Sequence, residues 1–144
     1  MSRFRQTKDP TGNPTLEALY QEIIDAGLVG GEPGVPNNLL TSLSERPDLL
    51  AATWELFKGL VIGGMLPPTV KEMIFMAIAA QNDCRYCSVV HTRALEAMGV
   101  PTDVIRSCAN DPELTQVPPP QRAMIKFGLE TARDPLMTVS SIHF

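Results

Sequence analysis

Apolar residues recur every three or four positions along most of the chain, which is the spacing of one face of an α-helix. Sustained alternation of apolar and polar residues is absent, and no Asn-Gly pair marks a hairpin turn. The sequence therefore predicts an all-α protein. Its helices are expected over 16–26, 47–62, 69–82, 84–98, 102–110 and 121–133, with a short helical turn over 39–43.

Polar residues, prolines and glycines separate the predicted helices. Residues 1–14 are mostly polar and contain two prolines and a glycine, so we expect a loose arm before the first helix. Thr15 is the expected N-cap of that helix. In the helix over 47–62, one face is expected to carry Leu50, Trp54, Phe57, Leu60 and Val61.

The predicted helix over 69–82 is apolar on almost every side, which indicates a buried position. Two prolines precede it, and Thr69 with Glu72 forms the T-x-x-E pattern of a capping box. Asn82 and Asp83 then provide a stop and a fresh N-cap for the next helix. The two helices therefore follow one another with almost no linker.

Composition narrows the class of protein. A chain of 144 residues, 44% of them apolar, fits one compact domain. The net charge of −4 gives no reason to expect nucleic acid or an anionic membrane as a partner. No stretch approaches the ~18 apolar residues of a membrane span, and the N-terminus lacks the apolar core of a signal peptide. The expected location is the cytoplasm.

The stretch QNDCRYCSVVHTR, residues 81–93, carries the clearest chemical signal. Cys84 and Cys87 are three residues apart, and His91 follows four residues later. At about 100° per residue, Cys87 lies about 300° and His91 about 340° from Cys84, so all three share one helix face. Both cysteines fall in the first turn, where unpaired backbone N–H groups favour a thiolate. The stretch therefore predicts a redox-active dithiol beside a proton carrier.

Other interpretations of this stretch compete with redox chemistry. A structural zinc site would use Cys84, Cys87 and His91, with Cys108 or His143 as the spare ligand, although neither of those two shows paired spacing. The same residues are also compatible with a purely structural role on a buried face, or with a disulfide staple, which gains little across so short a loop. Cys108 itself is interpreted as a small core residue without chemistry.

Glu72 has two interpretations. In the first it completes the capping box with Thr69, and in the second its carboxylate orients His91 or relays protons to it. If the two helices form an antiparallel hairpin, at 1.5 Å per residue, His91 lies about 10 Å and Glu72 about 18 Å below the tip. A crossing angle, a bridging water or a neighbouring subunit would have to close that gap.

Glu72, Cys84, Cys87 and His91 together have the spacing E-x11-C-x2-C-x3-H. This signature resembles that of the alkylhydroperoxidase D (AhpD)-like family, in the peroxidase-related branch of the carboxymuconolactone decarboxylase superfamily. The resemblance covers about residues 36–135 and extends to PNNLL, SERPDLLAA, GMLPPTVKEMI and ANDPELTQVPPPQRAMIKFGLETARDP. It implies an arm and helix over 1–35, and over 36–144 a helical bundle whose core hairpin carries the C-x2-C.

The resemblance also implies an activity and a role for each residue. Characterised relatives reduce hydroperoxides with a dithiol, without flavin or haem, so no cofactor and no metal is expected. Cys87 would attack the peroxide and become a sulfenic acid, and Cys84 would resolve it to a disulfide. His91 would take the proton of Cys87, and Glu72 would support His91. A dithiol reductant, such as a protein-bound lipoyl group or a thioredoxin-like protein, would restore the thiols, and the assembly is expected to be a homo-oligomer, a trimer or a hexamer.

The residues themselves leave the choice of nucleophile open. Cys87 is four residues from His91, about one helical turn, whereas Cys84 is seven residues away. This spacing favours Cys87 as the sulfur that a base assists. The helix terminus, in contrast, slightly favours Cys84.

Two features depart from the relatives' pattern. Tyr86 stands where the best-studied peroxidase has a second histidine, and we expect it to pack against the site or donate a hydrogen bond. Relatives continue with a further helix pair, whereas this chain stops at Phe144. The last helix is therefore expected to lack intramolecular cover and to pack against another subunit. Its apolar residues are Met124, Ile125, Phe127 and Leu129.

Two further functions are compatible with the sequence. One is decarboxylation of a carboxylated lactone, as in the superfamily's namesake, although that chemistry does not require the cysteine pair. The other is not enzymatic: an oligomeric redox sensor or a zinc-clipped interaction module.

Overall fold

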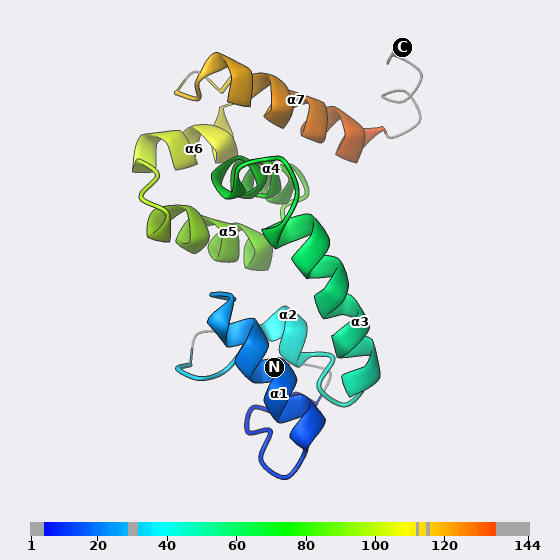
Figure 1. Ribbon diagram of the computed structural model, residues 1–144. Helices are drawn as coiled ribbons and strands as arrows, with labels where there is room; N and C mark the ends of the chain where they lie inside the picture. The colour runs from blue at the N-terminus through cyan, green and yellow to red at the C-terminus, as the bar shows by residue number, and fades with distance from the viewer. Residues whose placement is uncertain (1–4, 29–31, 112, 115, 135–144) are drawn as a thin grey trace. The chain divides into compact units, whose positions relative to one another are not determined.

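The computed structural model describes residues 5–28, 32–111, 113–114 and 116–134 (Figure 1). Every regular element in these residues is helical, which confirms the all-α class. The elements are α1 (Pro14–Asp25), α2 (Asn38–Thr41), α3 (Pro47–Phe57), the π-helical turn η1 (Lys58–Ile62), α4 (Pro68–Gln81), α5 (Arg85–Ala97), α6 (Thr102–Asn110) and α7 (Pro119–Arg133).

Contacts divide the chain into two compact units, Met1–Gly64 and Met65–Phe144. The sequence instead placed the start of the family-like domain at residue 36. That boundary came from resemblance rather than from contacts, and it stays a prediction. Each unit has its own apolar core.

In the first unit, α1, α2 and α3 surround one apolar cluster, which includes Leu50 and Trp54 as their helical spacing predicted. Its buried residues are Leu16, Tyr20, Ile23, Leu40, Leu50 and Trp54. The expected cap of α1 was wrong, because Asn13 rather than Thr15 is the N-cap and its side chain accepts a hydrogen bond from the Leu16 amide at 3.2 Å. Pro14 suits the first helical position, where no N–H is needed, so the helix begins earlier than predicted.

The N-terminal arm is held to the first unit rather than loose over residues 5–13. The Thr7 amide donates to the buried Ser44 hydroxyl at 2.8 Å, and the Tyr20 hydroxyl donates to the Thr7 carbonyl at 2.5 Å. The Gln6 amide group donates to the Asn38 carbonyl at 3.2 Å. Polarity alone suggested a free arm, but residues of this arm have partners up to 40 positions away along the chain, as in the pair of Arg5 with Glu45.

The predicted helix over 47–62 changes its winding near its end. After Phe57 the chain forms η1, closed by a hydrogen bond from the Gly63 amide to the Lys58 carbonyl at 2.8 Å. This wider turn shifts later side chains around the axis, so Leu60 is 64% exposed instead of sharing the buried face of Trp54. Glycine permits the closure, since a Cβ at Gly63 would lie 2.9 Å from the Lys58 carbonyl oxygen.

In the second unit, α4 is the central helix, and α5, α6 and α7 pack around it (Figure 1). Residues from Val70 to Ala79 are buried at most positions, as the all-round apolar pattern predicted. The core of this unit contains Met73, Met76, Ala77, Leu95, Ile105, Cys108, Leu114, Val117 and Ile125. α4 therefore contributes residues both to the core and to the candidate site.

α7 is covered within the chain to a greater extent than the sequence suggested. Ile125 is fully buried and Leu129 packs against the core, because α7 lies against α4. Gly128 allows the close approach, since a Cβ there would lie 2.8 Å from Ile74 Cγ2. Met124 and Phe127 face outward, 38% and 50% exposed.

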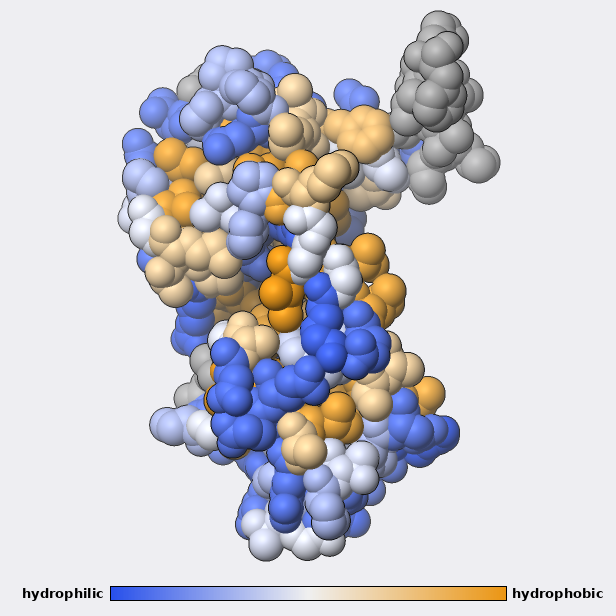
Figure 2. Space-filling view, viewed as in Figure 1, coloured by the Kyte–Doolittle hydropathy of each residue, from blue (hydrophilic) through white to orange (hydrophobic). Residues whose placement is uncertain are grey.

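Apolar side chains are also exposed elsewhere, and Figure 2 shows apolar and polar residues interspersed on one face of the molecule. The large exposed ones include Leu56, Leu60, Met65, Tyr86, Val89 and Phe127. Packing of α7 and of other apolar positions against further subunits stays a prediction.

Adding a methyl group at the α4–α7 contact is expected to destabilise the fold. Alanine favours a helix over glycine by about 1 kcal/mol, but overpacking against the stiff Ile74 side chain costs about 1–3 kcal/mol. Gly128→Ala should therefore lower the free energy of unfolding by about 1 kcal/mol, measured by urea denaturation. In an Ile74→Ala background the same change should be neutral or stabilising, and a stabilising effect of Gly128→Ala alone would contradict the close contact.

Candidate active site

The connection between α4 and α5 is three residues long and is fixed by backbone hydrogen bonds. The Cys84 amide donates to the Ala79 carbonyl at 2.9 Å, and the Asp83 amide donates to the Ala80 carbonyl at 3.1 Å. Asp83 has φ of 50°, the left-handed conformation that this type of helix ending requires. Asp83 was expected to cap α5, but its backbone instead reverses the chain, and the cap falls one residue later.

Cys84 is the N-cap of α5, and Cys87 lies in the first turn. The two are joined by a disulfide, with Cα atoms 5.4 Å apart. The Cys87 amide donates a hydrogen bond to the Cys84 sulfur at 3.3 Å, so a sulfur occupies the place usually taken by a serine or aspartate oxygen. The predicted reach between the two sulfurs is thus met, and the helix begins at Arg85 rather than at Cys84.

Glu72 and His91 form the second pair of the site. Glu72 Oε2 lies 2.7 Å from His91 Nδ1, and the side chains are only 11% and 22% exposed. A carboxylate can only accept, so His91 donates from Nδ1 and its Nε2 is left as the basic nitrogen. A buried carboxylate needs such a partner, because an unpaired charge in this position would be costly.

The separation expected between Glu72 and His91 was wrong. The estimate counted residues down an antiparallel hairpin, whereas Figure 1 shows α4 nearly end-on and α5 lying across it. Because the helices cross, positions at different depths along their axes meet near the crossing point. Of the three routes considered for closing the gap, the crossing angle suffices, within one chain.

The capping-box interpretation of Glu72 is also wrong. Pro67 is the N-cap of α4 and makes no side-chain cap hydrogen bond, so Thr69 lies inside the helix rather than at its cap. Pro67 and Pro68 start the helix before Thr69, so Thr69 and Glu72 do not occupy the N-cap and N3 positions that a capping box requires. The Glu72 carboxylate is directed at His91 instead.

One neighbour of His91 was missed in the sequence. The Phe75 ring lies 5.2 Å from the His91 ring, tilted by 34°. Phe75 follows Glu72 by three residues, so both lie on the α4 face that meets α5. That spacing was readable from the sequence, but an aromatic residue in an apolar helix gave no reason to separate it from the core.

The site lies within a region shared with known proteins. The family model described as Carboxymuconolactone decarboxylase family matches residues 47–127, more than half of the chain. The chain belongs to the carboxymuconolactone decarboxylase family. The matched region contains Glu72, both cysteines of the disulfide and His91, so the candidate site is part of the family's shared fold.

Among solved structures, this family member resembles the crystal structure of the alkylhydroperoxidase AhpD core from Rhodospirillum rubrum ATCC 11170. The two share 28% identity with a TM-score of 0.60, over 100% of this chain and 94% of the other. The match supports the AhpD-like helical fold predicted from the sequence. No curated protein sequence matches the chain significantly.

Cys108 lies in the core of the second unit, as predicted for a residue without chemistry. It is free and only 5% exposed. Burial disfavours the charged thiolate and raises the pKa of Cys108 to about 11. At neutral pH this family member therefore keeps Cys108 as an unreactive thiol.

The structure adds little to the predicted roles of Tyr86 and of the possible zinc ligands. Tyr86 is 44% exposed, and its supporting role remains a prediction. Among the described residues, no three His, Cys, Asp or Glu side chains are grouped to hold a metal ion. His143 lies outside those residues. None of the helices described is long and apolar enough to cross a bilayer.

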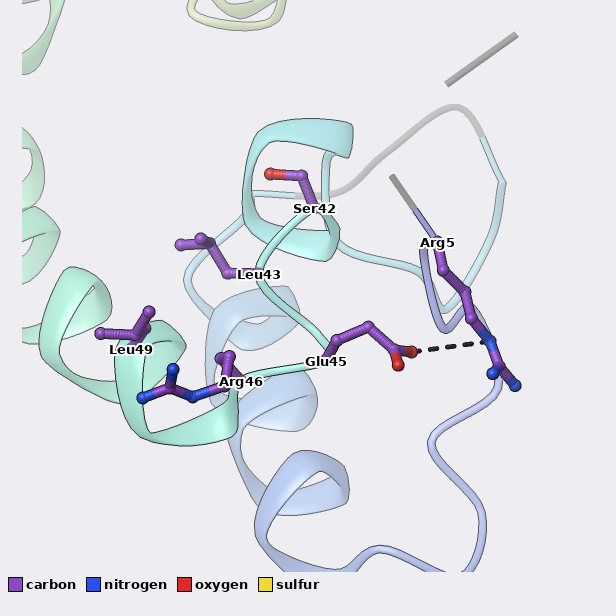
Figure 3. Close-up of a pocket in the computed structure, with 6 residues that line it drawn as sticks. All are labelled: Arg5, Ser42, Leu43, Glu45, Arg46 and Leu49. Carbon is purple, nitrogen blue, oxygen red and sulfur yellow. Dashed lines mark ion pairs between the residues drawn. The ribbon is translucent and has the colours of Figure 1, made fainter. Parts of the chain in front are cut away.

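A pocket in the first unit offers no comparable chemistry. It is lined by Leu43 and Leu49 together with Ser42, Arg5, Glu45 and Arg46 (Figure 3). Arg5 pairs with Glu45 at 3.7 Å, and Arg46 pairs with Asp48 at 2.6 Å. These pairs are exposed and already satisfy the charges at the rim, so the pocket has no group poised for reaction.

Thiol reactivity should separate Cys108 from the other two cysteines. Because its pKa is raised to about 11, Cys108 should resist alkylation at pH 8 and react only when pH approaches 11 or when the protein unfolds. After reduction, iodoacetamide at pH 8 should label Cys84 and Cys87 alone, as read by mass spectrometry of the intact chain and its peptides. Rapid labelling of Cys108 in the folded protein would contradict its burial.

Proposed function

We propose that this protein is a thiol-dependent peroxidase, or more broadly a disulfide oxidoreductase, that reduces hydroperoxides through Cys84 and Cys87. The observation that carries the proposal is the disulfide at the N-terminus of α5, one helical turn before His91. The buried carboxylate of Glu72 lies 2.7 Å from the Nδ1 atom of this histidine. The likeness to the alkylhydroperoxidase AhpD core supports the same chemistry.

The first step forms a sulfenic acid on Cys87. His91 Nε2 takes the thiol proton, because Nδ1 is engaged with Glu72. The Cys87 sulfur then attacks the outer oxygen of the hydroperoxide, the O–O bond breaks, and the alkoxide leaves as an alcohol after receiving a proton from His91. Glu72 stabilises the imidazolium formed in between, as the acid of a catalytic triad does.

The second step closes the disulfide. The Cys84 sulfur attacks the Cys87 sulfenic acid, the S–O bond breaks and water leaves. The product is the joined pair described above. A dithiol reductant, with a protein-bound lipoyl group or a thioredoxin-like protein as candidates, returns two electrons and two protons, so the cycle needs no flavin, haem or metal.

Decarboxylation of a lactone is the main alternative within the family. It transfers no electrons to or from the protein, so it has no use for a pair of sulfurs that can be joined. No contact of the described residues favours it over redox chemistry. The active assembly is proposed to be a homo-oligomer, a trimer or a hexamer.

Replacing the attacking sulfur should abolish turnover. Cys87→Ser should reduce hydroperoxide consumption, with dithiothreitol as the donor, to the uncatalysed rate, because a serine hydroxyl is a far weaker nucleophile at neutral pH. Cys108→Ala is the matched control and should keep the parent rate. Undiminished activity of Cys87→Ser would refute the assignment.

Removing the charge of Glu72 should slow the reaction without removing the sulfurs. Glu72→Gln should lower kcat by about 10- to 100-fold and alter the pH profile, because His91 loses the anion that fixes its tautomer. Glu96→Gln, an exposed change on α5, is the control. Thermal unfolding of both variants checks that the fold is kept, and a Glu72→Gln enzyme with the parent's rate and pH profile would exclude the relay.

A further inference from the structure

The two sulfurs of the disulfide have unequal surroundings. Cys84 Sγ accepts a hydrogen bond from the Cys87 amide at 3.3 Å and sits at the N-cap, where the helix presents its partial positive charge. Negative charge that develops on this sulfur is therefore stabilised by the backbone. The stabilisation needs no movement, because the donor amide is part of α5.

Cys87 is placed differently. It lies three residues into the helix, and its amide is already used to donate to Cys84. His91 lies one helical turn after Cys87, but its Nδ1 is paired with the Glu72 carboxylate, which offsets an imidazolium charge. Negative charge on Cys87 therefore receives less fixed stabilisation than negative charge on Cys84.

When a thiolate opens a disulfide, the sulfur that better carries negative charge leaves more readily. We propose that the reductant attacks Cys87 Sγ and that Cys84 leaves, an inference that rests on the proposed dithiol function. The new bond joins the reductant sulfur to Cys87, the Cys84–Cys87 bond breaks, and its electron pair stays on Cys84 as a thiolate. The second thiol of the reductant then attacks its own sulfur bound to Cys87, forming the oxidised reductant and releasing the Cys87 thiolate, which takes a proton.

In this order, each sulfur has the same role in oxidation and in reduction. Cys87 reacts with the external molecules, first the hydroperoxide and then the reductant. Cys84 is the internal partner, which adds to Cys87 when water leaves and departs when the reductant arrives. The docking surface for a reductant should therefore give access to Cys87 rather than to Cys84.

Peptide mapping tests the proposal directly. Oxidised Cys108→Ala protein is treated briefly with 2-mercaptoethanol, quenched in acid, and its freed thiol is alkylated. Trypsin cleaves after Arg85 and so places Cys84 in peptide 72–85 and Cys87 in peptide 86–93. We expect at least about three-fold more mercaptoethanol on Cys87, with the alkyl group mainly on Cys84. Equal labelling, or an excess on Cys84, overturns the proposal.

A second measurement covers the case in which the mixed disulfide closes again before the quench. Cys87→Ser and Cys84→Ser, each with Cys108→Ala, leave one active-site thiol, and the rate of iodoacetamide alkylation is followed against pH. Cys87→Ser keeps the backbone amide that donates to Cys84. The pKa of Cys84 should lie at least about one unit below that of Cys87. Equal values, or the reverse order, overturn the proposal.

Failure of this inference is distinguishable from failure of the proposed function. Both measurements use a chemical thiol and require no peroxide. If the protein lacks peroxidase activity but carries mercaptoethanol on Cys87, the sulfur assignment is supported and the peroxidase function is refuted. If the protein is an active peroxidase but carries mercaptoethanol on Cys84, the peroxidase function is supported and the sulfur assignment is refuted.

Discussion

The short connection between α4 and α5 is the constraint on which the site depends. Its hydrogen bonds close the end of α4 through the amides of Asp83 and Cys84, and the next residue already begins α5. Because the connection is so short, the crossing of α4 and α5 determines which of their residues are in contact. Glu72 and His91 are 19 residues apart in sequence, yet they lie within hydrogen-bond distance because of this junction and the packing of α5 on α4.

The buried carboxylate of Glu72 is by itself unfavourable for the stability of the fold. Most of the buried residues of α4 are apolar, and a charged side chain there lowers stability unless it is paired. Its partner is a histidine, whose proton can move, rather than an arginine, whose charge is permanent. A purely structural role would be served better by an apolar residue, so the pair is best understood through the chemistry of His91.

Sequence patterns were sufficient wherever one local rule decided the structure. The helical spacing of Leu50 and Trp54 identified a buried face, and the one-face stripe of Cys84, Cys87 and His91 indicated the candidate site. They were insufficient where two local rules competed. Thr69 and Glu72 satisfy a capping pattern, but the prolines before them and the tertiary partner of Glu72 decide the outcome.

Other failures depended on contacts between distant parts of the chain or on a change of helix type. The polar arm over residues 5–13 is held by Ser44 and Tyr20, which no local signal announces. The exposure of Leu60 follows from a π-helical turn that ordinary periodicity does not anticipate. The distance from Glu72 to His91 required the crossing of two helices, which residue counting along one axis omits.

Cys84 makes hydrogen bonds to both helices, and this has a consequence for the proposed redox cycle. Its amide completes the end of α4 while its sulfur caps α5, so the backbone at this residue is anchored independently of the bond to Cys87. Opening and closing the disulfide then requires only rotation of the two cysteine side chains. The reduced and oxidised forms can share one backbone, and the electrons can be exchanged without melting a helix end.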